Sequence, residues 1–460
     1  MRFISLLPVA LLPLVFITSD ARAPKSKFCY GKDDDPYSFF GTRTSYELAH
    51  GEILRLPANS HCKPIQIWGL IRHGSRFPKA EKIEKFIEMK KLRDEIVDNH
   101  WVRGRGNLCP TDVENLKNWD LSYNQTRPGN MSTQGKTELR LLAERLKAAF
   151  PELLDVDPRN VSQHDFIFRA TGEERTDVSM ESFMIGLFND STLIKPEEPP
   201  VNDYLLLAFR NCPAYLKSRD TDKVFAEAEK FAAGPEFQKT LENVSQRLGF
   251  DYVINLKTLL LIYDACRYEK SWFEPDRLAA WCAAFTEEDI EVLEYHEDVG
   301  CYYYSGPGRK INGDVGCPPL REMHKSFRRL ERKRDVEPKG IFYFAHTVTL
   351  QTAFRAFDIG INPVPLVGTN YEAMRNRVYK TSLLGPFAGN IISVFYRCND
   401  SKVPHRVQIF VSERVWTTEG CDDGVCDWQV LKKKYQKTVD ECDLSFCHKP
   451  GLILTQPAYY

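Results

Sequence analysis

The residues with the clearest capacity for chemistry stand together in Arg72-His-Gly-Ser-Arg-Phe-Pro78. Two arginines flank one histidine at close spacing. The arginine guanidinium is a planar, permanently charged fork that matches a phosphate group, and histidine is the side chain best suited to act as a nucleophile or proton carrier near neutral pH. The pattern therefore predicts chemistry on a phosphate, with His73 as a catalytic residue and with Arg72 and Arg76 binding the substrate.

A short buried strand must position this motif. The apolar residues 65–71 lie between Pro64 and the motif, and Gly74 ends the run. An apolar run of this length with such boundaries is typical of a buried strand. In open α/β sheets, ligands bind beyond the carboxyl ends of the strands. We therefore expect the motif to lie at the ligand-binding edge of a sheet.

Two further predicted strands end in similar residues. Arg169 closes a short apolar run, and Arg175 lies in the polar turn that follows it. His346 comes directly after the apolar residues 340–345. We predict that His346 is catalytic and that Arg169 and Arg175 bind substrate, with Arg175 also able to face solvent or a carboxylate.

Lysines follow the motif closely. Lys79, Lys82 and Lys85 lie just downstream of the motif, the last two within the first turns of a predicted helix over residues 81–97. They can supply the positive charge that a highly anionic substrate requires, or they can form a solvated helix face. Of the three, Lys79 is nearest the motif and is included among the predicted substrate-binding residues.

The sequence resembles the histidine acid phosphatases, whose signature is Arg-His-Gly-x-Arg-x-Pro with a distal histidine. Within that family it is most similar to the multiple inositol polyphosphate phosphatases, the phytase-like branch. The resemblance extends to segments outside the signature, namely Phe40-Gly-Thr-Arg-Thr-Ser-Tyr46, Pro235-Glu-Phe-Gln238, Pro386-Phe-Ala-Gly-Asn390 and Arg406-Val-Gln408. It implies hydrolysis of inositol hexakisphosphate and lower inositol phosphates, with bisphosphoglycerate as a further candidate. It also implies a phosphohistidine at His73 and no metal or other cofactor.

The chain departs from this family at the distal motif. The family has His-Asp or His-Ala-Glu there, and the carboxyl group protonates the leaving alcohol. Here Thr347 and Val348 follow His346. Loss of a positioned acid typically costs about a hundredfold to ten-thousandfold in rate. Two hypotheses follow, a phosphatase weakened by this loss and a pseudoenzyme that binds inositol phosphates without useful turnover.

Composition and targeting signals indicate an exported protein. The formal net charge of −1 gives no general attraction to nucleic acid. A positively charged start and an apolar stretch precede Ala21, which predicts a secretory signal over residues 1–21 and no membrane anchor. Sequons for glycosylation occur at Asn124, Asn130, Asn160, Asn189, Asn243 and Asn399. We expect a secreted or lumenal glycoprotein, whose oligomeric state the sequence leaves open.

The thirteen cysteines fit the same compartment. In an oxidising compartment disulfides are the default, and an odd number leaves at least one thiol unpaired or paired between chains. Cys442 and Cys447 are close in sequence, and we predict that they form a local disulfide.

The order of helical and strand patterns predicts a large α/β domain interrupted by a mostly helical one. After the strand that ends at Arg169, helical patterns occupy residues 222–233, 235–248, 252–268 and 275–295. Strand patterns return at 340–346, 390–397 and 406–411. We therefore assign residues 22–190 and 334–460 to an α/β domain of the histidine phosphatase type and 191–333 to a helical insertion, with the site between them.

Overall fold

The computed structural model describes residues 29–31, 37, 39–56, 61–121, 127–157, 159–272, 278–332, 337–399, 402–422 and 424–448. The predicted signal segment 1–21, the sequon at Asn124 and the start of the predicted helix at 275–295 lie outside the described residues. Within the described part of the chain, no helix has both the length and the apolar character that crossing a membrane requires.

The described strands form one mixed sheet in the order β2-β3-β1-β4-β5-β8-β7, with β6 paired to β5. β2, β3 and β1 are parallel, and β4 and the strands beyond it are antiparallel to their neighbours. The strands are β1 (Cys62–Arg72), β2 (Phe166–Ala170), β3 (Gly340–Ala345), β4 (Asn390–Cys398), β5 (His405–Val411), β6 (Arg414–Val415), β7 (Cys421–Asp422) and β8 (Val425–Asp427). The three strands expected to carry the site are thus neighbours, and their carboxyl ends share one edge.

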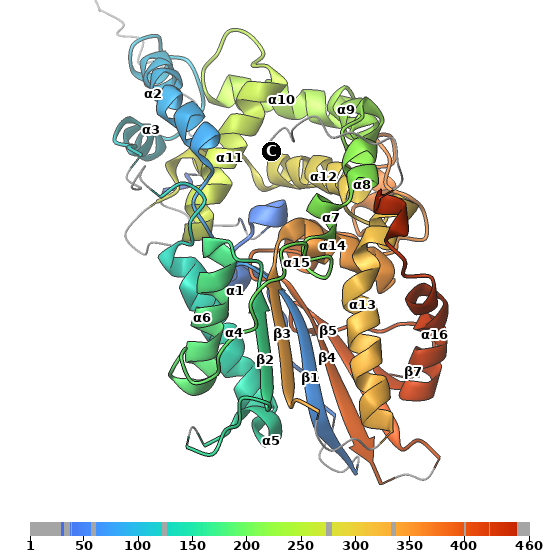
Figure 1. The fold of residues 1–460 in the computed structure, drawn as a ribbon. Coiled ribbons are helices and arrows are strands. Elements are labelled where there is room, and N and C mark those ends of the chain that lie inside the picture. Colours follow the sequence, from blue (N-terminus) through green and yellow to red (C-terminus); the bar gives the residue numbers. More distant parts are fainter. Residues whose placement is uncertain are drawn as a thin grey trace, which may run out of the picture.

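The helices of the described chain surround this sheet and extend beyond its carboxyl edge (Figure 1). They are α1 (Tyr46–Ala49), α2 (Ala80–Trp101), α3 (Pro110–Lys117), α4 (Thr133–Ala149), α5 (Pro151–Leu154), α6 (Glu174–Phe188), α7 (Ala208–Asn211), α8 (Pro213–Arg219), α9 (Ala226–Ala232), α10 (Pro235–Arg247), α11 (Leu256–Trp272), α12 (Glu287–Tyr304), α13 (Lys310–Glu331), α14 (Thr347–Ala356), α15 (Thr381–Leu384) and α16 (Trp428–Asp440). The expected combination of an α/β sheet with a helical part is confirmed.

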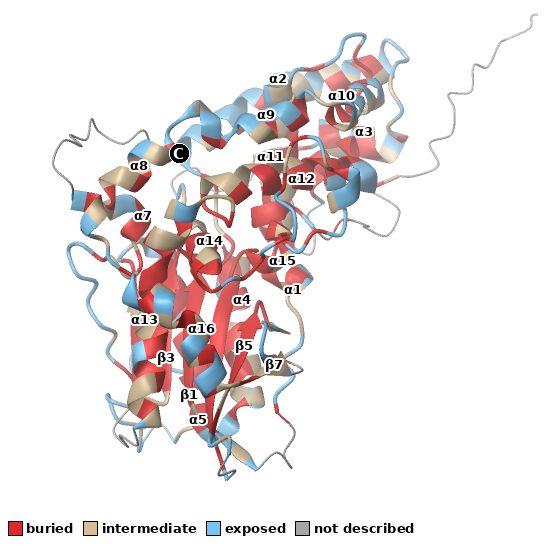
Figure 2. Ribbon diagram, turned by 90° about the vertical axis from the view of Figure 1, so that its right-hand side faces the viewer, coloured by how far each residue is buried: buried red, intermediate tan, exposed pale blue. Residues whose placement is uncertain are grey.

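Strand β1 is buried on both faces, and its alternating side chains belong to two different cores. Ile67 and Ile71 pack with α4 and α6 on one face. Trp68 and Leu70 pack on the other face, where α13 and α16 lie. Figure 2 shows the resulting layer of buried strands between helices. This double burial explains why residues 67–71 of β1 are apolar without interruption, as expected of a strand covered on both sides.

The helical predictions hold for most elements, although several boundaries differ and one predicted helix is divided. Residues 235–248 correspond to α10 and residues 252–268 to α11, which begins at Leu256. The predicted helix at 275–295 is instead a short 3-10 turn at Ala280–Ala284 followed by α12. Thr286 and Asp289 form a capping box that starts α12, which places the helix boundary inside the predicted segment.

Elements of the two predicted parts are interleaved in space. α2 and α3 precede the predicted insertion, yet they share a hydrophobic core with α10 and α11. α13 lies within the predicted insertion, yet Phe327 packs against Phe395 of β4 at a ring-centroid distance of 4.9 Å. The domain boundaries at 190 and 334 therefore stay a prediction.

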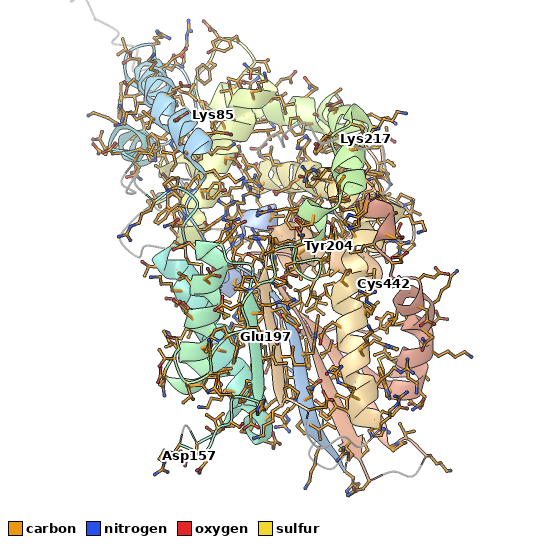
Figure 3. All side chains as sticks on the ribbon, viewed as in Figure 1. Lys85, Asp157, Glu197, Tyr204, Lys217 and Cys442 are labelled. Carbon is orange, nitrogen blue, oxygen red and sulfur yellow. A yellow bond between two sulfur atoms is a disulfide. The ribbon has the colours of Figure 1, made fainter. Side chains whose placement is uncertain are left out.

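Six disulfides join the described cysteines, and Cys301 is the unpaired thiol among them. The pairs are Cys29–Cys109, Cys62–Cys398, Cys212–Cys447, Cys266–Cys282, Cys317–Cys442 and Cys421–Cys426. The predicted Cys442–Cys447 disulfide is wrong. The segment after α16 lies between α13 and α8, so its two cysteines bond to those two helical regions and not to each other (Figure 3).

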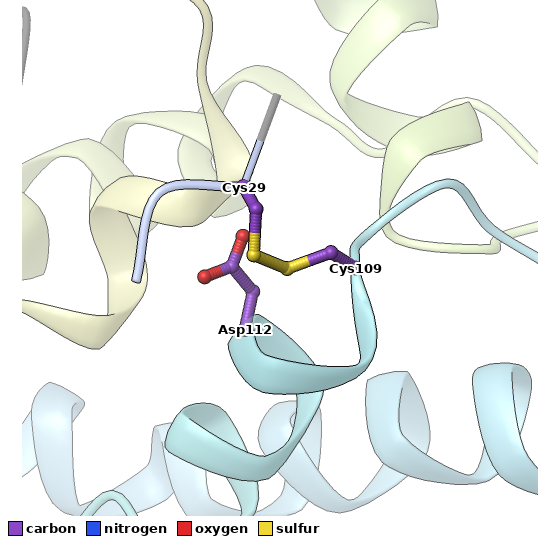
Figure 4. Close-up of side chains that lie close together, drawn as sticks. All are labelled: Cys29, Cys109 and Asp112. Carbon is purple, nitrogen blue, oxygen red and sulfur yellow. A yellow bond between two sulfur atoms is a disulfide. The ribbon is translucent and has the colours of Figure 1, made fainter. Parts of the chain in front are cut away.

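One disulfide has a carboxylate beside it. Cys29, Cys109 and Asp112 lie together, as Figure 4 shows. The two sulfur atoms are bonded to each other, and the Asp112 carboxylate accepts hydrogen bonds from the backbone N–H groups of Tyr30 (3.0 Å) and Gly31 (2.7 Å). These groups are thus already bonded within the chain, and the cluster anchors the segment near residue 30 to α3.

Candidate active site

The ends of β1 and β3 bring the two predicted catalytic histidines together. Arg72 is in register with Ala345, and the backbone N–H of His73 donates to the carbonyl of Ala345 at 3.0 Å. The rings of His73 and His346 have centroids 5.8 Å apart. Both side chains are buried. Parallel pairing of two strands therefore determines the spacing of the histidines.

A single hydrogen bond orients the His73 ring. Its Nδ1 lies 2.9 Å from the carbonyl oxygen of Gly74, which can only accept a hydrogen bond. Nδ1 must therefore carry the proton, and Nε2 keeps its lone pair. Burial, followed by the positive charges of Arg72 and Arg175, holds the pKa of His73 well below its usual range. The imidazole is neutral and presents a nucleophilic nitrogen.

The guanidinium of Arg72 is held by chain segments distant in sequence. It donates to the carbonyl oxygens of Thr42 at 2.6 Å and Gly385 at 2.9 Å. It also stacks on Phe387, with the guanidinium carbon 4.5 Å from the ring centroid. Its position is thus fixed without a carboxylate, which leaves its positive charge available to an anion.

A buried carboxyl group supports the loop between Arg72 and Arg76. Glu138 of α4 accepts hydrogen bonds from Ser75 N (2.7 Å) and Ser75 Oγ (2.8 Å), and from Ser45 Oγ (2.8 Å) and Tyr46 N (2.9 Å). Burial raises the pKa of Glu138 to about 7. Gly135, one turn earlier on α4, packs so closely on Ser75 that a Cβ atom would lie 2.1 Å from its carbonyl oxygen. Direct contacts from α4 therefore support the loop between Arg72 and Arg76.

His346 has a defined tautomer as well. Nη2 of Arg175 lies 3.4 Å from His346 Nδ1 and can only donate, so Nδ1 is the acceptor and Nε2 carries the proton. Nε2 lies 3.0 Å from Thr171 Oγ1, which in turn is 2.9 Å from Thr176 Oγ1. Thr176 donates to the carbonyl of Glu173 at 2.8 Å. The hydrogen bonds thus run in one direction, from the ring to the turn after β2.

The turn after β2 adds charge to this centre. Glu173 pairs with Arg175 and with Arg210 of α7, and its Oε1 lies 3.6 Å from His346 Nε2. Burial lowers the pKa of Arg175 to about 10, so its guanidinium stays charged. Burial, followed by the charges of Arg175 and Arg210, also holds the pKa of His346 well below its usual range. Arg175 therefore lies at the centre of the site.

Arg169 lies elsewhere. It is in register with Tyr343, three residues before His346, which is about 10 Å back along the strands. Its guanidinium pairs with Asp203 at 3.4 Å and Glu197 at 3.6 Å, and Figure 3 shows Glu197 beside β2. The structure thus brings Arg72, His73, Arg76, Arg175 and His346 together and leaves Arg169 with two carboxylates.

The three lysines differ in their surroundings. Burial, followed by the charges of Arg76 and Arg175, lowers the pKa of Lys79, which places this lysine beside the central arginines. Lys82 pairs with Asp264 of α11. Lys85 is exposed on α2 (Figure 3). Of the three, Lys79 is the one that the structure brings to the site.

The first residues of α14 stand where the family has its acidic residue. His346 is the N-cap residue, and Thr347 and Val348 occupy the first two positions of the helix. Val348 packs against the apolar cluster that contains Phe209. Neither side chain is a carboxyl group, so this position offers no carboxylic acid to a leaving group.

Several residues of the site could not be identified from the sequence motif. Glu138, Glu173 and Arg210 lie in segments that the motif does not mark. Tyr268 of α11 is a fourth residue of this kind. It is buried, and the guanidinium carbon of Arg43 lies 5.4 Å from the centroid of its ring. Burial raises the pKa of Tyr268, but the charges of Arg43 and Arg76 lower it to about 7. Only the tertiary structure brings these groups to the strand ends.

Comparison with known proteins agrees with this geometry. Residues 65–412 match the model of the histidine phosphatase superfamily, branch 2. The chain is 31% identical to multiple inositol polyphosphate phosphatase 1 of Drosophila melanogaster, with 97% of this chain and 94% of that protein covered. It is 26% identical to the human protein of the same name, with 96% and 95% covered.

Solved structures show the same fold. The phytase from D. castellii has a TM-score of 0.67 at 14% identity and covers 88% of this chain and 86% of its own. The Bifidobacterium longum multiple inositol polyphosphate phosphatase, in complex with inositol hexasulfate, has a TM-score of 0.64 at 13% identity, with 86% and 97% covered. The chain therefore belongs to branch 2 of the histidine phosphatase superfamily and, within it, to the multiple inositol polyphosphate phosphatases.

Proposed function

We propose that the chain is a secreted phosphomonoesterase that hydrolyses inositol hexakisphosphate and lower inositol phosphates through a phosphohistidine at His73. The observation that carries this proposal is the neutral His73 imidazole, whose Nε2 lone pair is surrounded by positive charge. Among the described residues, no carboxylate forms a salt bridge with Arg72 or Arg76. The buried Nε atoms of Arg72, Arg76 and Arg175 likewise have no hydrogen-bond partner within the described part of the chain.

These groups suit both steps of the reaction. Nε2 of His73 attacks phosphorus in line as the bond to the alcohol oxygen breaks. Arg72, Arg76 and Arg175 hold the equatorial oxygens with charge-assisted hydrogen bonds and stabilise the transition state. Water then attacks the phosphohistidine and releases inorganic phosphate. Nε2–H of His346 can donate to a phosphoryl oxygen, because its present acceptor is a neutral threonine hydroxyl.

The substrate class is supported by the relatives and by the charge of the site. The relatives are named for inositol polyphosphates, and the Bifidobacterium longum enzyme was solved with inositol hexasulfate, a ligand with six anionic groups. Beyond the three central arginines, Lys79 and Arg210 lie at the edge of the same centre. These charges suit a substrate with several phosphates, and bisphosphoglycerate remains a second candidate.

A phosphate-binding pseudoenzyme is the alternative, and Thr347 and Val348 favour it. Purified protein incubated with inositol hexakisphosphate distinguishes the two functions. We expect release of inorganic phosphate from the wild type and at least a thousandfold less from His73→Ala. Equal release from both proteins would refute the catalytic role of His73, and binding without release would favour the pseudoenzyme.

Trapping the intermediate tests the mechanism separately. A phosphoenzyme formed on histidine is labile in acid and stable in base, unlike a phosphoserine. Rapid alkaline quenching of a reaction with radiolabelled substrate should recover label on the wild type and none on His73→Ala. Export is tested by expression in animal cells, where the protein should accumulate in the medium and become smaller on enzymatic deglycosylation.

A further inference from the structure

Glu173 is a carboxylate in direct contact with the phosphate-binding centre. It follows β2 at the N-cap of α6, and its side chain pairs with both Arg175 and Arg210. Its Oε1 is 3.6 Å from Nε2 of His346. The side chain keeps 26% of its surface exposed, so an incoming ligand can reach it. Nothing in the sequence motif marks this residue, and none of the steps described so far uses its carboxyl group.

The other nearby carboxyl groups are already committed to structure. Glu297 pairs with Arg43 at 3.5 Å and with Arg267, and Asp264 pairs with Arg267 at 2.6 Å. Burial raises the pKa of Asp264, but the nearby cations have the larger effect and hold this pKa well below its usual range. Glu138 accepts four hydrogen bonds behind the loop and is fully buried. The side chains of Glu297 and Asp264 are 15% and 10% exposed and Glu138 is buried, so all three are less accessible to a ligand than Glu173.

We propose that Glu173 protonates the leaving alcohol and so replaces the acid missing from the start of α14. This inference rests on the proposed function. In the first step the His73 Nε2–P bond forms, the P–O bond to the alcohol breaks, and the carboxyl proton of Glu173 moves to the alcohol oxygen. In the second step water attacks phosphorus, the N–P bond breaks, and the Glu173 carboxylate takes the proton of that water. The carboxyl group is thus restored after each turnover.

Substrate binding supplies the proton affinity that this role requires. A bound phosphate competes for the Arg175 guanidinium, which releases Glu173 from one cation and places negative charge beside it. Both changes favour the protonated carboxyl group. The other charged or titratable groups that face Glu173 are Arg210 on α7, His346 at the start of α14, Lys79 at the start of α2, and Asp177 on α6.

The test compares two substrates on the same variant. An aryl phosphate has a good leaving group that needs little protonation, whereas an inositol alkoxide needs a proton. Glu173→Gln should lower kcat with inositol hexakisphosphate by about a hundredfold more than it lowers kcat with p-nitrophenyl phosphate. Glu181→Gln, an exposed position on the same helix, should leave both rates unchanged.

The outcomes separate this inference from the proposed function. If the wild type hydrolyses inositol hexakisphosphate and Glu173→Gln loses rate equally with both substrates, Glu173 only positions Arg175 and the inference is wrong. If the variant loses nothing while Tyr268→Phe shows the selective loss, the tyrosine is the donor. If the wild type cleaves the aryl phosphate alone, Glu173 is not a competent acid. If the wild type cleaves neither substrate, the proposed function itself fails.

Discussion

The buried carboxyl group of Glu138 offers a quantitative test of how the catalytic loop is supported. In Glu138→Gln one oxygen becomes an NH2 group. Whichever oxygen is replaced, the new N–H groups face a backbone N–H, either that of Ser75 or that of Tyr46. The less costly orientation faces Ser75 N alone, and the buried backbone N–H of Ser75 then loses its acceptor. Such a loss costs about 1–3 kcal/mol.

The effect should depend on pH in a defined direction. Burial raises the pKa of Glu138 from 4.5 to about 7 in the folded protein, so folding favours the protonated form. The stability that this group contributes is complete below pH 4.5 and is lost as pH rises to about 7. The rise corresponds to about 3 kcal/mol. Because glutamine does not titrate, the deficit of the variant should be largest near pH 5 and should shrink or reverse by pH 8.

Urea unfolding of both proteins at pH 5 and pH 8, with the disulfides intact, measures this change. The control is Glu144→Gln on the same helix, where an exposed pair with Arg140 is lost. That control should cost under about 1 kcal/mol at either pH. A deficit of Glu138→Gln that grows between pH 5 and pH 8 would refute the argument, because it would mean that the charged carboxylate is the form that the fold prefers.

Two further predictions concern the charges of the site. Arg175→Ala should raise the dissociation constant for inorganic phosphate by about tenfold to a hundredfold, whereas Arg169→Ala should change it by less than about threefold, as isothermal titration calorimetry would show. Equal effects would mean that Arg169 also reaches the ligand. In the Glu173→Gln background, Val348→Glu should raise kcat for inositol hexakisphosphate by restoring a carboxyl group at the start of α14, and an unchanged rate would show that a side chain there cannot reach the leaving group.

The sequence predicted the strand ends correctly because its signal there is local. An apolar run followed by Arg72 and His73 predicts both a strand and its functional end, and the same holds for β3 and His346. Which of Arg169 and Arg175 reaches the site could not be predicted from local sequence. Arg169 lies inside the strand, where parallel register places it level with Tyr343, while Arg175 lies on the helix that returns over the strand end. A pattern of residues along one strand does not contain that register.

The supporting residues could not be predicted for a related reason. Glu138 lies on the core-facing side of an amphipathic helix, next to Leu139 and Leu142, and only the packing of α4 on the loop explains a charged residue there. The Cys442–Cys447 prediction failed similarly, because closeness in sequence says nothing about which distant helix each cysteine meets. Contacts between distant segments carry this information, and a single sequence does not display them.

The hydrogen bonds that hold the Arg72 guanidinium make anion binding depend on the completed fold. Its guanidinium is positioned by carbonyl groups that lie 30 and 313 residues away in the chain. A chain that has not yet brought these three segments together lacks the arranged guanidinium, so phosphate should bind the native state far more tightly than any partly folded one. A ligand at a hundred times its dissociation constant would then stabilise the protein by about 2.7 kcal/mol. Inorganic phosphate, the product of the proposed reaction, would in this way act as a folding ligand for newly made protein.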